Sequence, residues 1–262
     1  MRTRNSRPAV LLSTLGFVAC VRRAPHVDLG ALVTDRPDFT ESTQIVPLGY
    51  TQVEIGGTAS RDGDVRNVAI GEALVRVGLA PRAEFRLTLP SFVTERSAGM
   101  SASGSDDAGL GVKVALHAGP ETPGSLEPSV SLLVGTSLPT GSELFGSRRA
   151  LPALKFLTSW TITDRLGFAS NVNWAHAEDA GAPHNEWSGS GSFAFAFSER
   201  VGGYAEYFLF GERASVWQRR DYLNGGVTFL LNDALQLDAR AGTRVDRAGD
   251  GVFFGLGVSR RF

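Results

Sequence analysis

Hydrophobic and polar side chains alternate with a period of two residues along much of this chain. In the stretch 83–89 the apolar residues share one face, whereas Glu84, Arg86 and Thr88 share the other. Successive side chains of a β-strand point to opposite faces, so this pattern predicts a strand with one apolar and one polar face. The same alternation recurs at 110–117, 187–198 and 235–242.

Applied to the whole chain, this interpretation predicts about twelve strands. They cover 50–59, 68–79, 83–93, 109–117, 128–138, 151–162, 166–175, 186–197, 201–210, 221–231, 235–242 and 251–262. Most are close to the roughly 9–11 residues that a tilted strand needs to cross a bilayer. Strands of globular proteins are commonly shorter, about 5–6 residues. Strand length therefore favours a transmembrane β-barrel.

The connections between these strands alternate between short and long. Three-residue turns lie at 80–82, 163–165, 198–200 and 232–234, and longer polar loops lie at 60–67, 94–108, 139–150, 176–185, 211–220 and 243–250. Outer-membrane barrels have tight turns on one side and longer loops on the other. Segment 118–127 departs from this pattern, because it is long where a short turn is expected. A soluble β-sandwich, which remains the alternative, gives no reason for such alternation.

Aromatic residues mark many of the predicted strand ends. These residues are Tyr50, Trp160, Trp174, Trp187, Tyr204 and Tyr222. Tryptophan and tyrosine favour the boundary between lipid and water, so the placement indicates an aromatic girdle. The final strand, 251–262, is amphipathic apart from Arg260 and ends on Phe262. A terminal phenylalanine of this kind resembles the signal recognised by the outer-membrane assembly machinery.

The first 23 residues have the pattern of a secretory signal. Three arginines precede an apolar run of 14 uncharged residues, 8–21, which is too short to span a bilayer comfortably as a helix. The alternative is an ordinary buried N-terminal helix. Cys20 follows Phe17-Val18-Ala19, which loosely resembles a lipoprotein cleavage site, and lipidation of Cys20 is a second hypothesis. The longest later uncharged stretch, 128–142, is broken by proline and glycine and cannot be a spanning helix.

Composition narrows the function classes. The chain has 262 residues, which suits a single all-β domain. Its net charge of −1 excludes a strongly basic nucleic-acid binder. Its single cysteine, Cys20, falls in the predicted signal, so the mature chain would have no intramolecular disulfide and no cysteine metal site.

Charged side chains fall on the polar face of the predicted strands and would line the lumen. The acidic ones are Glu54, Glu72, Glu84, Glu206 and Asp238, the basic ones are Arg76, Arg86, Lys113, Lys155 and Arg240, and His117 would face the lumen near a turn. A lumen of balanced sign disfavours a strongly ion-selective porin. We expect pairs across the interior, with Arg76 facing Glu84 across a short turn. Contact with a substrate is the alternative role.

Catalytic and metal chemistry have weak support. His176 and His184 would lie in one loop, but no serine motif accompanies them, and a barrel lipase needs a positioned Ser–His pair. A metal site at His176, Glu178, Asp179 and His184 has no diagnostic spacing. The Gly-Ser segment 189–192 lies within a strand and is no phosphate-binding loop. We therefore expect no enzyme, no metal and no cofactor.

One block of the sequence resembles a known family. Asp35-Arg36-Pro37-Asp38-Phe39-Thr40-Glu41-Ser42, followed by 46–56, resembles the opening of bacterial outer-membrane proteins named for the meta-pathway of phenol degradation. The segment 76–79 and the closing Arg261-Phe262 are similar to that family too, and Thr43 stands where we expect proline. The resemblance covers residues 33–262. It implies a transporter-like barrel for hydrophobic or aromatic compounds and brings no catalytic residues.

These observations predict an all-β, single-domain, twelve-stranded antiparallel outer-membrane barrel at 50–262, preceded by an N-terminal segment at 24–49. Its expected partners are outer-membrane lipid, the outer-membrane assembly machinery and an unidentified small solute, which passes passively. Alternatives are a structural or assembly-related barrel with a closed lumen, and an outer-membrane enzyme. The block 35–42 would fold into the lumen as a plug or latch, with Arg36 paired to a carboxylate. Otherwise it would form a periplasmic arm that helps assembly.

Overall fold

The computed structural model describes residues 29–120, 122–179, 182–213, 217–246 and 249–262. The predicted signal and Cys20 lie outside these residues. The described part of the chain forms β1 (Thr51–Asp62), β2 (Val65–Ala80), β3 (Ala83–Leu89), β4 (Phe92–Ser97), β5 (Met100–Ser105), β6 (Gly109–His117), β7 (Ser129–Ser137), β8 (Leu151–Thr163), β9 (Leu166–Asp179), β10 (Ala182–Ala196), β11 (Val201–Arg213), β12 (Trp217–Asn232), β13 (Leu235–Arg244) and β14 (Val252–Arg261).

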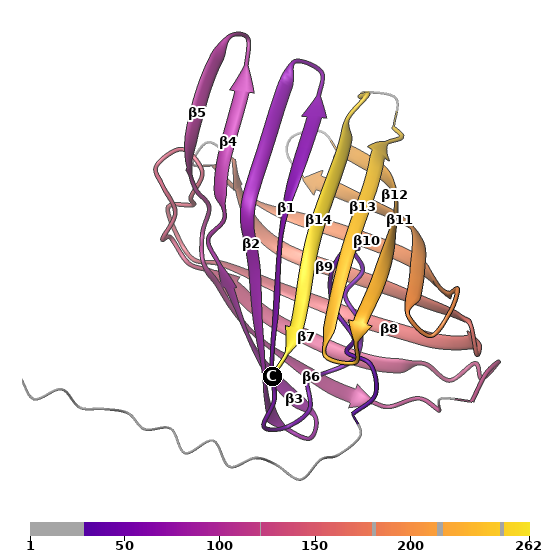
Figure 1. The fold of residues 1–262 in the computed structure, drawn as a ribbon. Helices are drawn as coiled ribbons and strands as arrows, with labels where there is room; N and C mark the ends of the chain where they lie inside the picture. Colours follow the sequence, from indigo (N-terminus) through magenta and orange to yellow (C-terminus); the bar gives the residue numbers. More distant parts are fainter. Residues whose placement is uncertain (1–28, 121, 180–181, 214–216, 247–248) are drawn as a thin grey trace, which may run out of the picture.

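All these strands belong to one antiparallel sheet that closes on itself. Each strand from β7 to β13 pairs with both of its neighbours in the chain, β14 pairs with β13, and β1 pairs with both β14 and β2. β2 pairs with β3 and then β4, while β6 pairs with β3 and β5 pairs with β4. β3 and β4 therefore form one interrupted strand, as do β5 and β6. The predicted twelve-stranded antiparallel barrel is confirmed (Figure 1).

The barrel has two unlike ends. Short turns join β2 to β3, β8 to β9, β10 to β11 and β12 to β13, and we call this side the turn end. At the opposite side, the hairpin end, strands extend beyond the body of the barrel (Figure 1). Segment 118–127 lies at the turn end and packs on β8, where Gly124 N donates to Thr161 O (3.0 Å) and Trp160 Nε1 to Leu126 O (3.1 Å). Its length thus serves contact with a neighbouring strand.

Several predicted loops are strands instead. The ranges 60–67, 94–108, 176–185 and 211–220 are largely extended, and 94–108 holds most of the β4–β5 hairpin. These ranges were predicted as loops because their residues are polar. Paired strands continue there into water, where their backbone hydrogen bonds form without an apolar face. His176 and His184, predicted in a loop, lie on the paired strands β9 and β10.

A bulge in β2 changes which side chains face inward. Gly56 pairs with Glu72 and Gly57 with Ile70, so Gly71 is an extra residue, and its φ is 80°. Only glycine adopts such a φ readily. Strict alternation from Arg76 would turn Ile70 inward, but the bulge leaves it 63% exposed. The bulge therefore keeps Glu72 in the lumen and Ile70 outside.

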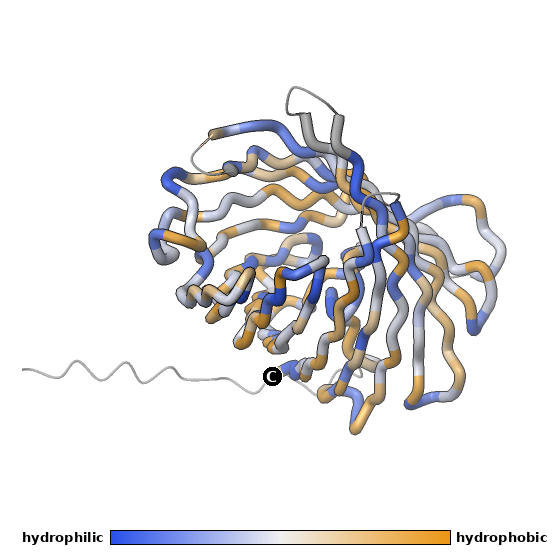
Figure 2. Tube along the Cα trace, turned by 90° about the horizontal axis from the view of Figure 1, so that it is seen from above, coloured by the Kyte–Doolittle hydropathy of each residue, from blue (hydrophilic) through white to orange (hydrophobic). Residues whose placement is uncertain are grey.

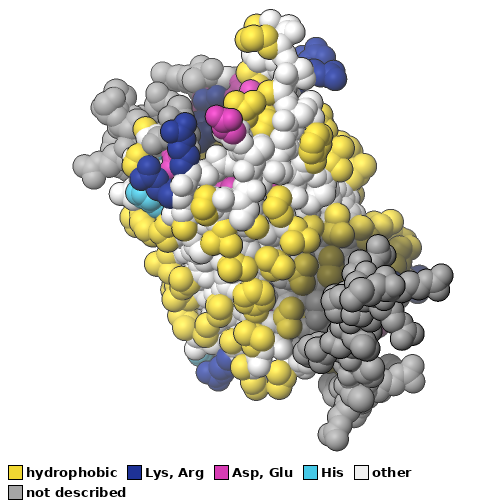
Figure 3. Space-filling view, turned by 90° about the vertical axis from the view of Figure 1, so that its left-hand side faces the viewer, with side chains coloured by type: hydrophobic (Ala, Val, Ile, Leu, Met, Phe, Trp, Pro, Cys, Tyr) yellow, Lys and Arg dark blue, Asp and Glu magenta, His cyan; other side chains and the backbone are white. Residues whose placement is uncertain are grey.

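The exterior of the barrel is apolar and its interior is polar. On β14 the outward residues Val252, Phe254, Leu256 and Val258 are exposed, and Figure 3 shows hydrophobic side chains covering the middle of one face with charged ones mostly towards its ends. Hydrophilic and hydrophobic positions alternate along the strands in Figure 2. The fully buried side chains include Arg76, Lys113, Glu54 and Glu84. This is the reverse of a soluble core. The described residues include no helix long and apolar enough to cross a membrane.

The predicted aromatic girdle is correct only in part. Trp160 and Phe168 pack together outside the barrel (ring centroids 5.7 Å apart), and Trp187 is half exposed. Tyr204 and Tyr222 instead face the lumen, because they share their strand faces with inward polar residues. Parity along the strand, rather than proximity to its end, decides where these rings point.

Candidate functional site: a plug in the lumen

Residues 32–46, which we call the plug, lie inside the barrel. The chain reaches the turn end where Leu32 N donates to Asp233 O (2.8 Å), and it is held there by Arg261, whose guanidinium donates to Gly30 O (2.7 Å). It returns to β1 through a bend in which Tyr50 N donates to Pro47 O (3.0 Å). Gly78 on β2 permits this bend, because a methyl group there would collide with the Pro47 carbonyl. Both ends of the plug are therefore at the turn end.

Asp35 is the centre of the largest ionic cluster. Its carboxylate contacts Arg86, Lys113 (2.8 Å) and Arg76 (3.4 Å), three buried cations from three strands. Glu84 contacts the same three cations, including Arg76 at 3.0 Å as the sequence predicted. Glu54 accepts from Arg76 Nη1 (3.0 Å) and from the Asp35 backbone N–H (3.0 Å). The plug thus completes a network that the wall begins.

The wall around this cluster carries unequal charge. Four cations lie here, Arg76, Arg86, Lys113 and Lys155, but among the wall carboxylates that the structure describes only Glu54 and Glu84 contact them. The excess of two positive charges is neutralised by Asp35 and by Glu41. Glu41 contacts Lys155 (2.5 Å) and Arg86 (3.2 Å). A buried unpaired charge costs free energy. The seated plug therefore stabilises the barrel interior by supplying the two carboxylates that balance its charge.

Arg36 lies in a slot between the first and last strands. Gly56 on β1 pairs with Gly257 on β14, and a methyl group on either would collide with the Arg36 side chain. The guanidinium contacts Glu72 (3.2 Å) and Asp238 (3.7 Å) and donates to Leu256 O (3.2 Å). These ion pairs of Arg36 with lumen carboxylates are the contacts expected if the block 35–42 folds into the lumen. The two glycines were not anticipated, since they lie about 200 residues apart in sequence.

The opposite wall holds the plug through hydrogen bonds. Glu206 accepts from Phe39 N (2.9 Å), Thr40 N (2.6 Å) and Thr40 Oγ1 (2.6 Å). Arg240 Nη1 donates to Pro37 O (2.9 Å). The plug is therefore tied to strands on both sides of the lumen.

The last part of the plug is held by β7 and β8. Ser131 Oγ donates to Thr43 O (2.6 Å), and Thr43 Oγ1 and Ser159 Oγ lie 2.7 Å apart. Lys113 Nζ also donates to Ser42 O (2.9 Å). With these contacts every residue of the block 35–42, apart from Asp38, has a wall contact already named here. Asp38 Oδ2 accepts a longer hydrogen bond from Ser192 Oγ (3.4 Å).

Aromatic rings surround Phe39 of the plug. Phe39 stacks on Phe208 (centroids 4.7 Å apart, interplanar angle 18°) and meets Phe210 edge-on (5.2 Å, 72°). Tyr222 stacks on the far side of Phe208 (4.9 Å, 12°), and Phe253 lies 6.4 Å from Tyr222. These wall rings were missed by the sequence analysis. The available signal was that Phe208 and Phe210 share the polar face of their strand with Glu206.

Cavities lie on either side of the plug. One of about 400 Å³ is lined by plug residues together with Tyr204, Ser159 and Gln236. A second of about 500 Å³ is lined by Glu72, Arg240 and residues of β3. Arg36 lines both cavities. The plug therefore separates two spaces within the same lumen.

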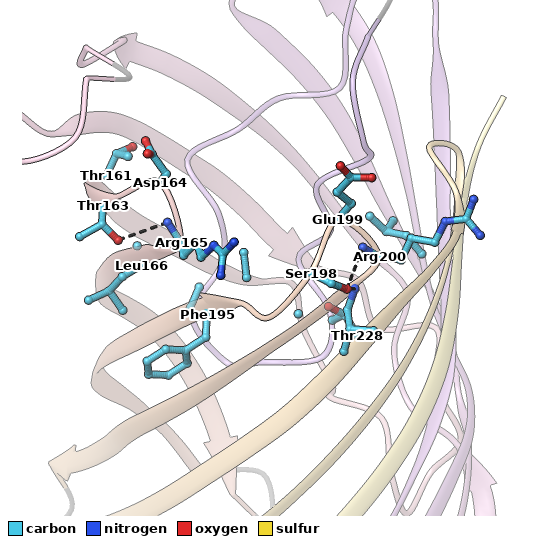
Figure 4. A pocket seen from close by; sticks show the side chains of 16 residues that line it. Thr161, Thr163, Asp164, Arg165, Leu166, Phe195, Ser198, Glu199, Arg200 and Thr228 are labelled. Atoms are coloured by element: carbon cyan, nitrogen blue, oxygen red, sulfur yellow. Dashed lines mark hydrogen bonds between the residues drawn. The ribbon is translucent and has the colours of Figure 1, made fainter.

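A recess of about 410 Å³ lies among the neighbouring turns at the turn end. Figure 4 shows Asp164 and Arg165 on one turn and Glu199 and Arg200 on the next. Thr163 Oγ1 accepts from Arg165 N (3.2 Å), and Ser198 Oγ accepts from Arg200 N (3.3 Å). Hydroxyl groups that accept hydrogen bonds from the backbone two residues later help to keep these turns tight. The recess has no lining residue from the plug.

The plug carboxylates have shifted pKa values. Burial alone would raise the pKa of Asp35, but the charges of Arg76, Lys113 and Arg86 outweigh burial and hold its pKa well below the usual range. Burial likewise opposes ionisation of Glu41, whereas Lys155 and Arg86 lower its pKa to about 2. For Asp38, burial and the neighbouring Glu206 raise the pKa well above the usual range. Ionised Asp35 and Glu41 therefore fit the seated plug.

We expect the Glu41→Gln variant to lose part of the pH dependence of plug seating. A pKa lowered from 4.5 to about 2 stabilises the seated plug above pH 4.5, and that contribution, on the order of 3 kcal/mol, disappears as the pH falls towards 2. Asp38 acts in the opposite direction. The measurement is the conductance of reconstituted barrels as the pH is lowered from about 6 to about 3. At pH 6 the variant should conduct more than the wild type, and its conductance should then rise less.

Glu127→Gln is the matched control for this experiment, because Glu127 pairs with exposed His117 at the turn end (2.6 Å) and not with the plug. Its pH profile should follow the wild type. Equal profiles for all three proteins would contradict the role of Glu41.

The predicted histidine sites do not join the plug. His117 follows an irregular pairing of β6 with β7, and its half-exposed ring binds Glu127. His176 Nδ1 lies 3.3 Å from Asn185 Oδ1, and Glu178 pairs with Arg149. Within the described residues no group of three or more potential ligands is close enough to hold a metal ion. The lumen candidates that meet the plug directly are Glu54, Glu72, Arg76, Glu84, Arg86, Lys113, Lys155, Glu206, Asp238 and Arg240.

Comparison with known proteins gives a family and a fold. A family described as "Putative MetA-pathway of phenol degradation" matches residues 34–262. No curated protein matches the chain significantly. The KdgM porin is 12% identical to this chain with a TM-score of 0.50, and its complex with disordered oligogalacturonate is 11% identical with a TM-score of 0.51. Each alignment covers 80% of this chain and 99% of the porin. The CymD monoaromatic hydrocarbon channel is 8% identical (TM-score 0.48), with 83% of this chain and 89% of that one covered. At these identities the porin likeness shows the barrel fold alone.

Proposed function

This chain belongs to the MetA-pathway family of phenol degradation, and from that membership we propose that it is an outer-membrane channel for small hydrophobic or aromatic molecules, gated by residues 32–46. The observation that carries the proposal is the plug itself. It lies in the lumen with a cavity on each side of it, and the contacts that hold it are non-covalent, among them ion pairs, hydrogen bonds and ring contacts. Such contacts can break and form again without any change in covalent bonds.

The exterior supports a location in lipid. A soluble protein rarely exposes a contiguous apolar band of this extent, and apolar residues on the outer face of β8, β9 and β14 are exposed, including Leu154, Phe156, Val172 and Leu256. The outer surface also has an apolar recess at Leu154, Phe156 and Val172, beside Trp174 and Trp187. Aromatic residues flanking an apolar band suit the two lipid–water boundaries.

The interior supports passage without a coupled energy source. With the plug seated, Arg76, Arg86, Lys113 and Lys155 are each paired with a carboxylate of the wall or of the plug, so these four cations form no uncompensated row that would select ions. Displacing the plug, and Arg36 with it, would join the two cavities. A solute would then move down its own gradient.

A closed, structural barrel is the second candidate, because the plug is bound to many strands and its central carboxylate is buried. We distinguish the two by uptake into vesicles with reconstituted protein. Benzenesulfonate is the probe, since its permanent charge keeps it from crossing lipid, and cyclohexanesulfonate is the matched ring without π electrons.

We expect vesicles with wild-type barrels to take up benzenesulfonate faster than empty vesicles do. A chain without residues 33–45 lacks the plug, so it should admit both probes and conduct several-fold more current. Mobility of unheated and boiled samples in gels would verify that the shortened barrel is folded. Uptake by neither protein would favour the closed structural barrel. Equal uptake by both proteins would remove the plug from the gate.

A further inference from the structure

The side chain of Phe39 is held differently from the rest of the plug. Its neighbours in sequence are fixed by charges and hydrogen bonds, such as those of Glu206 with the Phe39 and Thr40 N–H groups. The ring itself meets other rings, with Phe208 against its face at 4.7 Å and Phe210 against its edge at 5.2 Å. We call the position between Phe208 and Phe210 that this ring fills the Phe39 slot.

The Phe39 slot selects for flat aromatic rings. Stacked and edge-on arrangements at these distances are the favoured geometries for π systems, and they add to the energy of simple apolar burial. Phe208 is 7% exposed and is backed by Tyr222, so the wall of the slot is supported before any solute arrives. A saturated ring of similar size could fill the volume but would lack the ring–ring interaction.

The Phe39 slot is also connected to the gate. Phe39 lies between Pro37, whose carbonyl binds Arg240, and Thr40, which binds Glu206 and Ser190. A ring that replaced Phe39 would have to move the plug backbone from these partners. A ligand that binds only the displaced state shifts the plug towards that state in proportion to its affinity.

We propose that the Phe39 slot is the binding position for the aromatic ring of the transported solute, which Phe39 occupies while the lumen is closed. This rests on the proposed function and extends it by naming a site and a ligand class, single-ring aromatic molecules. Phe39 is thus a competitor of the solute and not one of its binding residues. The solute itself favours opening by taking the position of this ring.

The test is a binding measurement whose sign separates these two roles. Fluorine NMR of 4-fluorophenol, titrated with the full-length barrel in lipid nanodiscs, reports binding. Truncation in Phe39→Ala should tighten binding roughly three- to tenfold, the change that corresponds to the energy of an aromatic pair. A residue that contributed to solute binding would give the opposite sign. Unchanged or weaker binding in Phe39→Ala would overturn the proposal.

Three controls define the site. Phe208→Leu should weaken binding in the Phe39→Ala background, because it removes the stacking face. Phe156→Ala, on the exposed exterior of β8, should leave binding unchanged and accounts for partition into lipid. Unlabelled phenol should displace the probe, whereas cyclohexanol should not. Displacement by both to the same degree, or an equal loss with Phe156→Ala, would contradict an aromatic slot.

Equilibrium binding does not require passage through the membrane, so the two proposals fail separately. Competition with Phe39, combined with no uptake of benzenesulfonate, would retain the slot and reject transport. Uptake without competition would retain the channel and reject the slot.

Discussion

Asparagine in place of Asp35 is expected to shift the equilibrium from seated to displaced plug about a hundredfold or more, and so to raise the conductance of the barrel several-fold, towards that of the chain without residues 33–45. Three buried cations share this carboxylate, Arg76, Arg86 and Lys113. Without its charge the three cations retain, among the described residues, the wall carboxylates Glu54 and Glu84 and, at Arg86, the plug carboxylate Glu41. Removing one partner from a buried ion pair typically costs about 3–5 kcal/mol, because the remaining charge is uncompensated. Release of the plug lets water reach these cations.

The measurement is single-channel conductance in planar bilayers, together with the temperature at which the folded form unfolds in gels. Asp62→Asn is the matched control, since Asp62 pairs with Arg244 (3.1 Å) at the hairpin end and is half exposed. Exposed pairs contribute about 0–1 kcal/mol, so this variant should behave as the wild type does. Equal conductance of Asp35→Asn, Asp62→Asn and wild type would show that the carboxylate does not hold the plug.

A disulfide between positions 43 and 159 is expected to lock the lumen closed. Thr43 belongs to the plug and Ser159 to β8, and their hydroxyl oxygens lie 2.7 Å apart. Cysteines at both positions (T43C/S159C) place two sulfur atoms within reach of a bond. Under oxidising conditions the uptake of benzenesulfonate should fall to the level of empty vesicles, and a reductant should restore it. The large, reversible effect follows because a covalent link removes the displaced state altogether.

The control crosslinks the wall without the plug. Thr94 on β4 and Ser103 on β5 have hydroxyl oxygens 3.1 Å apart near the hairpin end, so T94C/S103C forms the same bond between two neighbouring strands. Any contribution of the natural Cys20 is the same in both variants and therefore cancels. We expect uptake through T94C/S103C to be the same with and without reductant. Undiminished uptake through oxidised T43C/S159C would mean that solutes pass beside a fixed plug.

The fold was readable from the sequence because lipid and water impose a local pattern. An outward residue must be apolar and its neighbour may be polar, so strands such as β6 and β14 show their parity in the order of residues. Where both faces of a strand contact water this constraint disappears. The hairpin β4–β5 and the parts of β9 and β10 at the hairpin end were therefore predicted as loops.

The site was readable only in outline. The inward charges and the pairing of Arg76 with Glu84 follow from parity and from a short turn. The distribution of charge does not, since equal totals of acids and bases concealed the local excess that Asp35 and Glu41 neutralise. Non-local contacts were missed for the same reason. Nothing near Phe39 in the sequence specifies that Phe208 will stack on it.

The glycine pair beneath Arg36 has a consequence for the order of assembly. Gly56 belongs to the first strand and Gly257 to the last, and they face each other only when β1 and β14 have paired. Until then the slot for the guanidinium does not exist, nor do Glu72 and Asp238 lie on the two sides of it. Arg36 therefore cannot dock on an open sheet. The N-terminal segment, although synthesised before every strand, reaches its final position after the last one.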